Sequence, residues 1–214
     1  MDVVLRNLDA YGAGIRSTVW LSVVSFALAL LLGFVIATFR VSPVAPLRAA
    51  GLIYVETFRN VPLTAFFALA VFGLPKAGVT FSFFGFAVMV LGVYTGAFVA
   101  EAVRSGINTV AAGQAEAARS LGLTFGQTIG YVVLPQALRT VVQPIGSLFI
   151  ALVKNSAIAS VFAVVELTSQ FDSLTERNAA TLPLLVGTAI AYLLITIPAG
   201  LLTGLVERKV AFKR

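Results

Sequence analysis

Residues 113–135, GQAEAARSLGLTFGQTIGYVVLP, form a stretch of moderate polarity between segments that are overwhelmingly apolar. Its first part, residues 114–121, is rich in Ala, Glu, Arg and Leu, which are good helix formers. Gly122 then stands where a glycine commonly follows the end of a helix. We therefore expect a short helix over residues 114–121.

A second short helix is expected directly afterwards. Thr124 is followed three residues later by Gln127, the spacing of a capping box. Pro135 disfavours helical geometry in the residue before it, so this helix is expected to end at Leu134. The stretch thus predicts two short helices joined in an elbow, which in a membrane protein is the natural place for a partner.

The composition is that of an integral membrane protein. Hydrophobic residues make up 59% of the chain and charged residues 11%, with a mean hydropathy of +0.98, whereas soluble proteins average about 25% charged residues. The 214 residues suffice for about five spans of roughly 20 residues each. We expect one all-α transmembrane domain, residues 1–214, with the elbow at residues 113–135 inside it.

Missing residue types exclude several classes of function. The chain has no cysteine and no histidine, which excludes disulfides, thiolate or imidazole metal sites and Ser-His-Asp triads. None of its four lysines follows a glycine, so the phosphate-binding G-x-x-x-x-G-K-[ST] motif is absent and the chain is not expected to hydrolyse ATP. No cofactor or metal is expected in this chain.

The apolar segments predict five spans. They cover residues 18–39, 49–72, 81–100, 136–165 and 182–206. The first run is too long for the core of a signal peptide, so we interpret it as a retained span. Residues 166–181 are predicted to be a polar outer loop, in which Glu166 and Asp172 are either solvated or receive a binding protein.

Polar residues interrupt the second span. Glu56 and Arg59 lie three apart, hence on one helical face where they can pair, and Asn60 follows. Pro62 is expected to begin the fully embedded part of this span or to kink it.

The third and fourth spans also contain small, charged or helix-breaking residues with expected structural roles. Gly92 and Gly96 would let another helix approach closely, and Glu101 and Arg104 are expected to form a bracing pair at the end of the third span. The fourth span is expected to be interrupted at Gln143-Pro144 and at Lys154-Asn155-Ser156.

Charge counting predicts the orientation. With the amino terminus outside, nine cations lie on inner segments and four on outer ones. The inner set is Arg40, Arg48, Arg104, Arg119, Arg139, Arg208, Lys209, Lys213 and Arg214, and the outer set is Arg6, Arg16, Lys76 and Arg177. The positive-inside rule therefore places the elbow and the carboxyl terminus in the cytoplasm. The same rule accounts for the net charge of +6, so no nucleic-acid partner is expected.

The elbow resembles the EAA motif of ATP-binding-cassette importer permeases. Glu116-Ala117-Ala118, Gly122 and Leu134-Pro135 fall in register with that motif, and Val132 stands where it has Ile. Residues 54–75, 94–114 and 151–160 also look like polar amino-acid permeases of the histidine, glutamine and glutamate branch, so that roughly two-thirds of the chain is covered. The likeness is greatest to actinobacterial glutamate permeases.

The resemblance implies a type I importer permease in a bacterial cell membrane, working by alternating access. It implies an ATPase dimer that holds ATP and Mg, a second permease chain that is often a different homologue, and an extracytoplasmic substrate-binding protein, all in contact with membrane lipid. The elbow would transmit the ATPase motion through Glu116, Ala117, Ala118, Arg119, Leu121 and Gly122. Glu116 and Arg119 are expected to pair with each other or with residues of the partner. Ala117, Ala118 and Leu121 are expected to pack on the bundle or in the ATPase groove.

An amino-acid zwitterion needs a cation for its carboxylate and acceptors for its ammonium. Arg59 and Lys154 are the only basic residues well inside spans, and polar groups flank both. The expected substrate or gate residues are Glu56, Arg59, Asn60, Lys154, Asn155 and Ser156. The first candidate substrate is glutamate or aspartate.

Several alternatives remain open from the sequence. Arg59 is equally compatible with bracing a gate, and Lys154 with bonding carbonyls at a helix break. The substrate is alternatively glutamine or a basic amino acid, or the companion chain alone holds the site. A channel subunit is the alternative from a different class.

Overall fold

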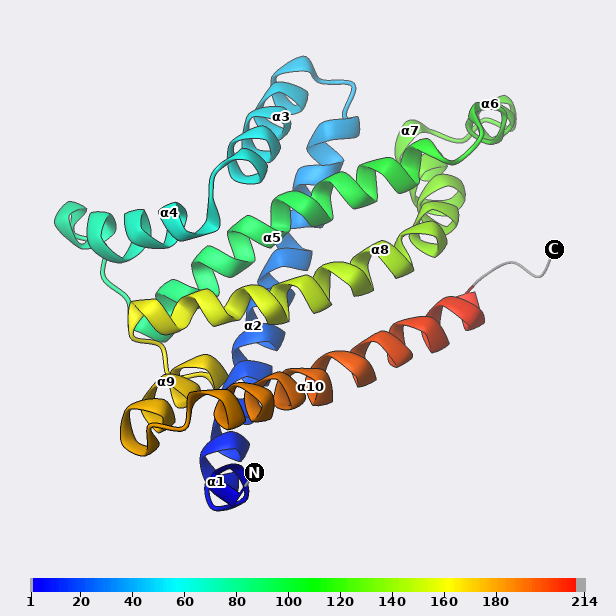
Figure 1. The fold of residues 1–214 in the computed structure, drawn as a ribbon. Helices are drawn as coiled ribbons and strands as arrows, with labels where there is room; N and C mark the ends of the chain where they lie inside the picture. Colours follow the sequence, from blue (N-terminus) through cyan, green and yellow to red (C-terminus); the bar gives the residue numbers. More distant parts are fainter. Residues whose placement is uncertain (1, 211–214) are drawn as a thin grey trace.

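The computed structural model describes residues 2–210, which fold into helices with no strand in that range (Figure 1). The expected all-α membrane fold is confirmed. The α-helices are α1 Asp2–Leu5, α2 Leu8–Val41, α3 Ala45–Asn60, α4 Leu63–Ala68, α5 Phe83–Asn108, α6 Ala112–Ser120, α7 Phe125–Gln127, α8 Leu134–Asn155, α9 Leu167–Asn178 and α10 Thr181–Val210. Two π-helices, η1 Leu69–Gly73 and η3 Thr128–Val133, and two 3₁₀-helices, η2 Leu74–Ala77 and η4 Ser156–Phe162, connect them.

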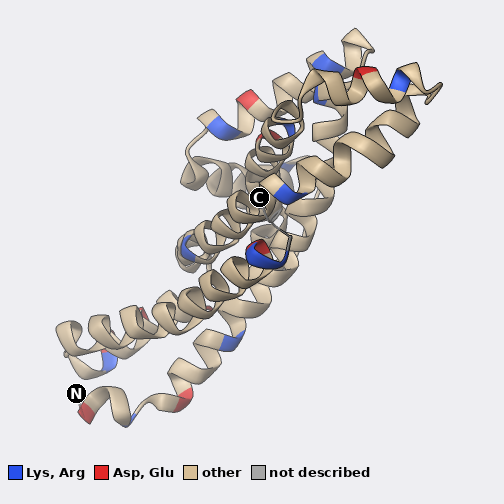
Figure 2. Ribbon diagram, turned by 90° about the vertical axis from the view of Figure 1, so that its right-hand side faces the viewer, with Lys and Arg blue, Asp and Glu red and all other residues tan. Residues whose placement is uncertain are grey.

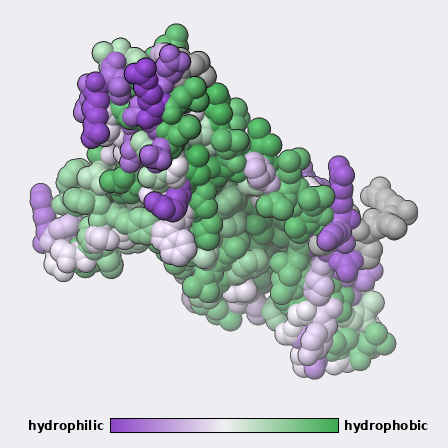
Figure 3. All heavy atoms as spheres, turned by 90° about the horizontal axis from the view of Figure 1, so that it is seen from below, coloured by the Kyte–Doolittle hydropathy of each residue, from purple (hydrophilic) through white to green (hydrophobic). Residues whose placement is uncertain are grey.

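Four described helical segments are long and apolar enough to cross a membrane, and a bent pair brings the number to five. Charged residues are sparse, and long stretches of ribbon carry none (Figure 2). Hydrophobic residues cover the middle of the face in Figure 3, with hydrophilic residues gathered near its edges. The cations Lys213 and Arg214, which the orientation count included, lie outside the described residues.

The bent pair confirms the expected break at Pro62. Helices α3 and α4 meet at 105°, and Pro62 is the extended residue that precedes the first turn of α4. The proline has no N–H to continue the hydrogen-bond ladder of α3, which ends with Val61 donating to the carbonyl of Thr57. The turn brings α3 and its polar end alongside α5.

Helices α2 and α5 form the most extensive contact in the described chain and cross at close range (Figure 1). A Cβ placed on Gly33 of α2 would lie 2.4 Å from Val99 Cγ1, and one on Gly92 of α5 would lie 2.6 Å from Leu28 Cδ2. The close helix approach predicted at Gly92 is thus found within the chain, against its own α2. The small residues let the two backbones pack by van der Waals contact, which drives helix association in lipid.

The fourth span differs from the prediction at its start and in its first half. Leu134-Pro135 does not end a helix, because the backbone runs through the π-helix η3 directly into α8. In a π turn the hydrogen bond spans five residues, and Leu134 donates to the carbonyl of Ile129, which leaves room for the proline ring. Pro144 likewise stays inside α8, so the expected interruption there is wrong.

The break predicted at Lys154-Asn155-Ser156 is confirmed as a change of helix type. The α-helix α8 ends at Asn155 and the tighter 3₁₀-helix η4 begins at Ser156. η4 then ends at Ala163, whose φ of 61° is left-handed. The span is therefore a long α-helix with a 3₁₀ cap.

We predict that Gly33→Ala lowers the thermal midpoint of the purified protein in detergent. The added methyl overlaps Val99, and overpacking of this kind typically costs about 1–3 kcal/mol. Gly204→Ala is the matched control, because a Cβ there meets nothing within 4 Å and alanine favours a helix over glycine. Equal midpoints in the two variants would show that the α2–α5 contact is not close.

Candidate functional site

The elbow has the two helix-end structures that its sequence predicts. Helix α6 ends at Ser120, and Gly122 follows in the left-handed conformation with φ of 85°. Gly122 donates its N–H to the carbonyl of Arg119, and Leu123 donates its N–H to the carbonyl of Ala118. These are the two hydrogen bonds of a Schellman motif. The glycine therefore reverses the chain between the two parts of the elbow.

The capping box that begins the second part is also confirmed. The N–H of Gln127 donates to Thr124 Oγ1 at 3.3 Å, and the N–H of Thr124 donates to Gln127 Oε1 at 2.9 Å. Helix α7 then continues as η3, against which α6 packs. Both parts of the elbow are thus fixed by local hydrogen bonds.

Three large apolar side chains of the elbow lie exposed. Leu121 is 83% exposed, Tyr131 74% and Phe125 54%. Ala118 instead is buried within this chain, and Glu116, Ala117 and Arg119 face outward. The elbow therefore presents an apolar surface that this chain leaves uncovered.

Glu116 and Arg119 do not pair with each other. The two ion pairs found among residues 2–210 both involve Glu101. The main-chain carbonyl of Glu116 accepts a bond from Ser120 Oγ at 3.0 Å. Of the two expectations for this pair, the internal one is wrong.

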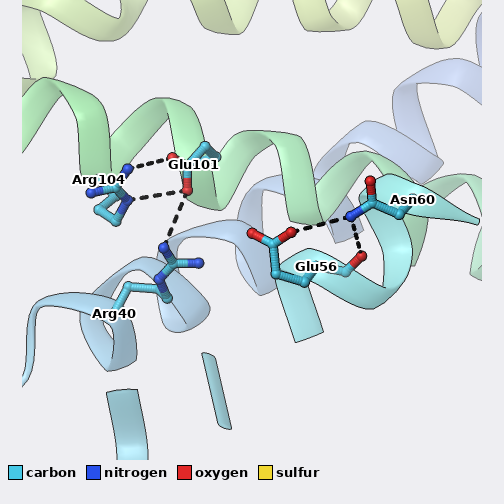
Figure 4. Close-up of polar contacts among 5 residues, drawn as sticks. All are labelled: Arg40, Glu56, Asn60, Glu101 and Arg104. Atoms are coloured by element: carbon cyan, nitrogen blue, oxygen red, sulfur yellow. Dashed lines mark hydrogen bonds and ion pairs between the residues drawn. The ribbon is translucent and has the colours of Figure 1, made fainter. Parts of the chain in front are cut away.

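Glu101 on α5 is the centre of a cluster of cations (Figure 4). Arg104 donates to both carboxylate oxygens, through Nε at 3.1 Å to Oε2 and through Nη2 to Oε1. Arg40, from the end of α2, places Nη2 3.7 Å from Oε2. The predicted Glu101–Arg104 pair is confirmed, and the carboxylate also ties α2 to α5.

The predicted Glu56–Arg59 pair is wrong. Glu56 accepts a bond from Asn60 Nδ2 at 3.1 Å instead (Figure 4). The Arg59 guanidinium lies over the ring of Phe98, 5.6 Å from its centroid, in cation–π geometry. Arg59 therefore points from α3 toward α5, away from its helical neighbour.

A groove runs between α5 and α8. One cavity of about 360 Å³ is lined by Arg59, Glu101 and the hydroxyl residues Ser105, Thr109 and Thr140. A second, of about 170 Å³, adjoins it through Phe98 and Leu148 and reaches Tyr94, Thr95 and Asn155. We call these two cavities the α5–α8 groove. It holds one cation, one carboxylate and several hydroxyls within reach of a small polar molecule.

The groove brings together only some of the predicted site residues. Arg59 and Asn155 line it, whereas Glu56, Asn60, Lys154 and Ser156 do not. Lys154 is exposed on α8, and Ser156 is buried with its hydroxyl donating to the carbonyl of Val153 at 2.8 Å. Glu101 was predicted only as a brace. Ser105 and Thr109 were missed, although their spacing of four residues places them on one helical face.

Glu166 does not lie in a solvated loop. It is fully buried and caps α9, accepting a bond from the Ser169 N–H at 2.8 Å and one from the Tyr192 hydroxyl at 2.9 Å. Burial raises the pKa of this carboxyl above its ordinary value, and these hydrogen bonds offset part of the effect. The predicted outer loop is therefore helix α9, anchored by a buried acid, while Asp172 is exposed on it.

Comparison with known families decides what this architecture is. The family model for the binding-protein-dependent transport system inner membrane component matches residues 29–212. The chain belongs to this family. It is a permease subunit of an ATP-binding-cassette transporter, and such subunits are not themselves ATPases, because ATP hydrolysis occurs on a partner subunit.

The permease has well-matched relatives among amino-acid transporters. It is 36% identical to the probable glutamine ABC transporter permease GlnM of Bacillus subtilis, over 98% of this chain and 97% of the relative. It is 41% identical to the glutamate transport system permease GluC of Corynebacterium glutamicum, over 92% of each chain. The polar amino-acid branch that the sequence indicated is thereby confirmed.

Solved structures agree with the fold. An amino-acid ABC transporter crystallised with histidines matches with a TM-score of 0.89 at 31% identity, over 96% of both chains. A permease of the MetNI methionine transporter in an inward-facing form matches with a TM-score of 0.84 at 20% identity, over 97% of this chain and 99% of that one. The permease therefore has the type I importer fold.

We predict that the stability of the permease falls as pH rises through the raised pKa of Glu166, and that Glu166→Gln removes this contribution. The folded state holds the proton more tightly than the unfolded state, whose carboxyl pKa is about 4.3. The stabilising contribution is thus complete below about pH 4 and is lost above the folded pKa. Thermal midpoints across pH would measure this change.

Glu166→Leu serves as the comparison, because it removes both the charge and the cap. Loss of the cap to Ser169 should cost about 1 kcal/mol at every pH. A pH profile of Glu166→Gln identical to that of the unmodified permease would contradict the assignment.

Proposed function

We propose that the permease moves a polar amino acid into the cell by alternating access, with glutamate or aspartate as the first candidate. The observation that carries this proposal is the α5–α8 groove, where Arg59, Glu101 and three hydroxyl side chains line one cavity. A guanidinium binds a carboxylate, and the hydroxyl oxygens of Ser105, Thr109 and Thr140 accept hydrogen bonds from an ammonium, so the groove matches both ends of a zwitterion.

The relatives support an amino acid and leave two candidates. Glutamate is printed in the name of the Corynebacterium glutamicum relative, and glutamine in that of the Bacillus subtilis relative. A glutamate/aspartate import permease of Escherichia coli, 36% identical over 92% of this chain, favours an acidic substrate. Hydroxyl groups in the groove bond a side-chain amide as well as a carboxylate, so glutamine is the second candidate.

Arg59 is the cation that we assign to substrate. It stands at the break between α3 and α4 and lines the groove. Arg104 and Arg40 are already committed to Glu101. Asn155 lies where α8 changes to 3₁₀ geometry, and transporter sites gather at such discontinuous helices.

Coupling to ATP is assigned to the elbow. Its most exposed apolar side chain, Leu121, belongs to the surface that a partner would cover. We propose that this partner is an ATPase dimer that binds ATP and Mg, and that Glu116, Ala117 and Arg119 lie at the same contact. A third cavity, of about 460 Å³, shares Thr109 and Thr140 with the groove and reaches Gln114 in α6, so the groove continues toward the elbow.

The remaining partners follow from this assignment. A second permease chain, as a homologue or a second copy, would close the open side of the α5–α8 groove. The bias of basic residues supports an amino terminus outside and an elbow inside. The opposite end, with α9 and the exposed Asp172, would then face an extracytoplasmic binding protein.

We predict that Arg59→Ala weakens uptake more than Lys154→Ala does, because Arg59 lines the groove and Lys154 does not. Loss of a charged hydrogen bond costs about 1.5–3 kcal/mol, which corresponds to an increase in KM of about 10-fold to 150-fold. The assay is uptake of labelled glutamate and glutamine by the whole transporter in vesicles supplied with binding protein and ATP.

Arg6→Ala controls for the loss of an exposed cation far from the α5–α8 groove. Arg59→Lys tests whether a positive charge without the guanidinium geometry is enough to keep the KM for uptake unchanged. Equal KM values for Arg59→Ala and the unmodified permease would refute the assigned site. Failure of the unmodified transporter to accumulate any amino acid would refute the function itself.

A further inference from the structure

A second groove, separate from the α5–α8 groove, lies between the elbow and helices α2 and α5. Its cavity of about 550 Å³ lies between the last turns of α2, the end of α5 and the elbow. Its walls are almost entirely apolar, with Thr38 and Ser42 as the polar members. The elbow side consists of Phe125, Ile129 and Leu134. We call this the elbow groove.

The groove opens where the bundle surface is apolar and exposed. Val35, one turn before Thr38 on α2, is 44% exposed, and Leu31 is 64% exposed. Side chains of this kind on a spanning helix face lipid. The elbow groove therefore adjoins an exposed apolar surface of α2, of the kind that acyl chains cover in a membrane.

A guanidinium stands at the rim. Arg48 donates through Nη1 to the carbonyls of Ser42 and Pro43, at 2.9 and 2.7 Å, and both of these residues line the groove. Within residues 2–210, its Nε and Nη2 have no protein acceptor, and the residue is exposed. An apolar groove with a half-satisfied guanidinium at its mouth matches an acyl chain joined to an anionic headgroup.

We propose that the elbow groove binds one acyl chain of an anionic phospholipid, whose phosphate is held by Arg48. The occupant fills the space between α2, α5 and the elbow, and so stabilises the elbow against the bundle. The lipid belongs to the leaflet at the elbow end of the bundle. The identity of that leaflet as the cytoplasmic one rests on the proposed orientation, whereas the site itself does not.

The test is photocrosslinking in the intact transporter. A benzophenone amino acid replaces Phe125 at the groove, or Trp20 on the lipid-exposed face of α2, which is 60% exposed. Vesicles contain equal amounts of phosphatidylglycerol and phosphatidylcholine, and mass spectrometry identifies the lipid attached to each position. We expect adducts at Phe125 to be enriched about fivefold in phosphatidylglycerol, the factor for one guanidinium near an anionic headgroup. Adducts at Trp20 should follow the vesicle composition.

Two variants separate headgroup recognition from groove occupancy. Arg48→Ala should return the adducts at Phe125 to the vesicle composition, while Arg16→Ala, an exposed cation elsewhere on α2, should not. Thr38→Trp should fill the groove and remove lipid adducts at Phe125, while Val35→Trp should leave them. Adducts at Phe125 that follow the vesicle composition, or that join to another subunit in place of lipid, would overturn the proposal.

Discussion

The close crossing of α2 and α5 is the contact on which the rest of the structure depends. Glycines at Gly33 and Gly92 bring the two helices within van der Waals contact of side chains on the opposite helix. In lipid no hydrophobic effect drives helices together, so this fit and the polar bonds beside it must supply the association. Helix α5 is thereby held against α2, and its other side is free to form the α5–α8 groove.

Two carboxylates, the half-buried Glu101 and the buried Glu166, act at opposite ends of this frame. Glu101 joins Arg40 of α2 to Arg104 of α5 near the elbow. Glu166 caps α9 and accepts a bond from Tyr192 of α10 at the other end. Charges inside a membrane protein are costly unless paired, whereas a carboxyl without a cation favours its protonated form. The first therefore acts as an ionic link between helices, and the second as a hydrogen-bonded cap.

Local signals in the sequence predicted local structure well. The capping box at Thr124 and the left-handed Gly122 depend on residues a few positions apart, and both were found.

The predictions failed where tertiary contact decided the outcome. Arg59 turned from its neighbour Glu56 to Phe98 on another helix. Arg40 of α2 meets Glu101 of α5, which lies 61 positions later in the sequence. Pro135 is accommodated by the π-helix η3, and a proline in the sequence does not by itself indicate a π-helix. Only Glu166, with Ser169 three residues later, carried an overlooked local signal for its cap.

The central claim is that the elbow transmits the work of an ATPase to the groove. The chain has no cysteine, so Leu121→Cys introduces a single thiol at the most exposed apolar side chain of the elbow. The decisive measurement is the rate of maleimide labelling of that thiol in the purified permease, with and without its ATPase subunits. Burial at the contact predicts much slower labelling in the presence of the ATPase, with no change at an Ala179→Cys control on the opposite end. Equal rates at Leu121→Cys in both states would contradict the account.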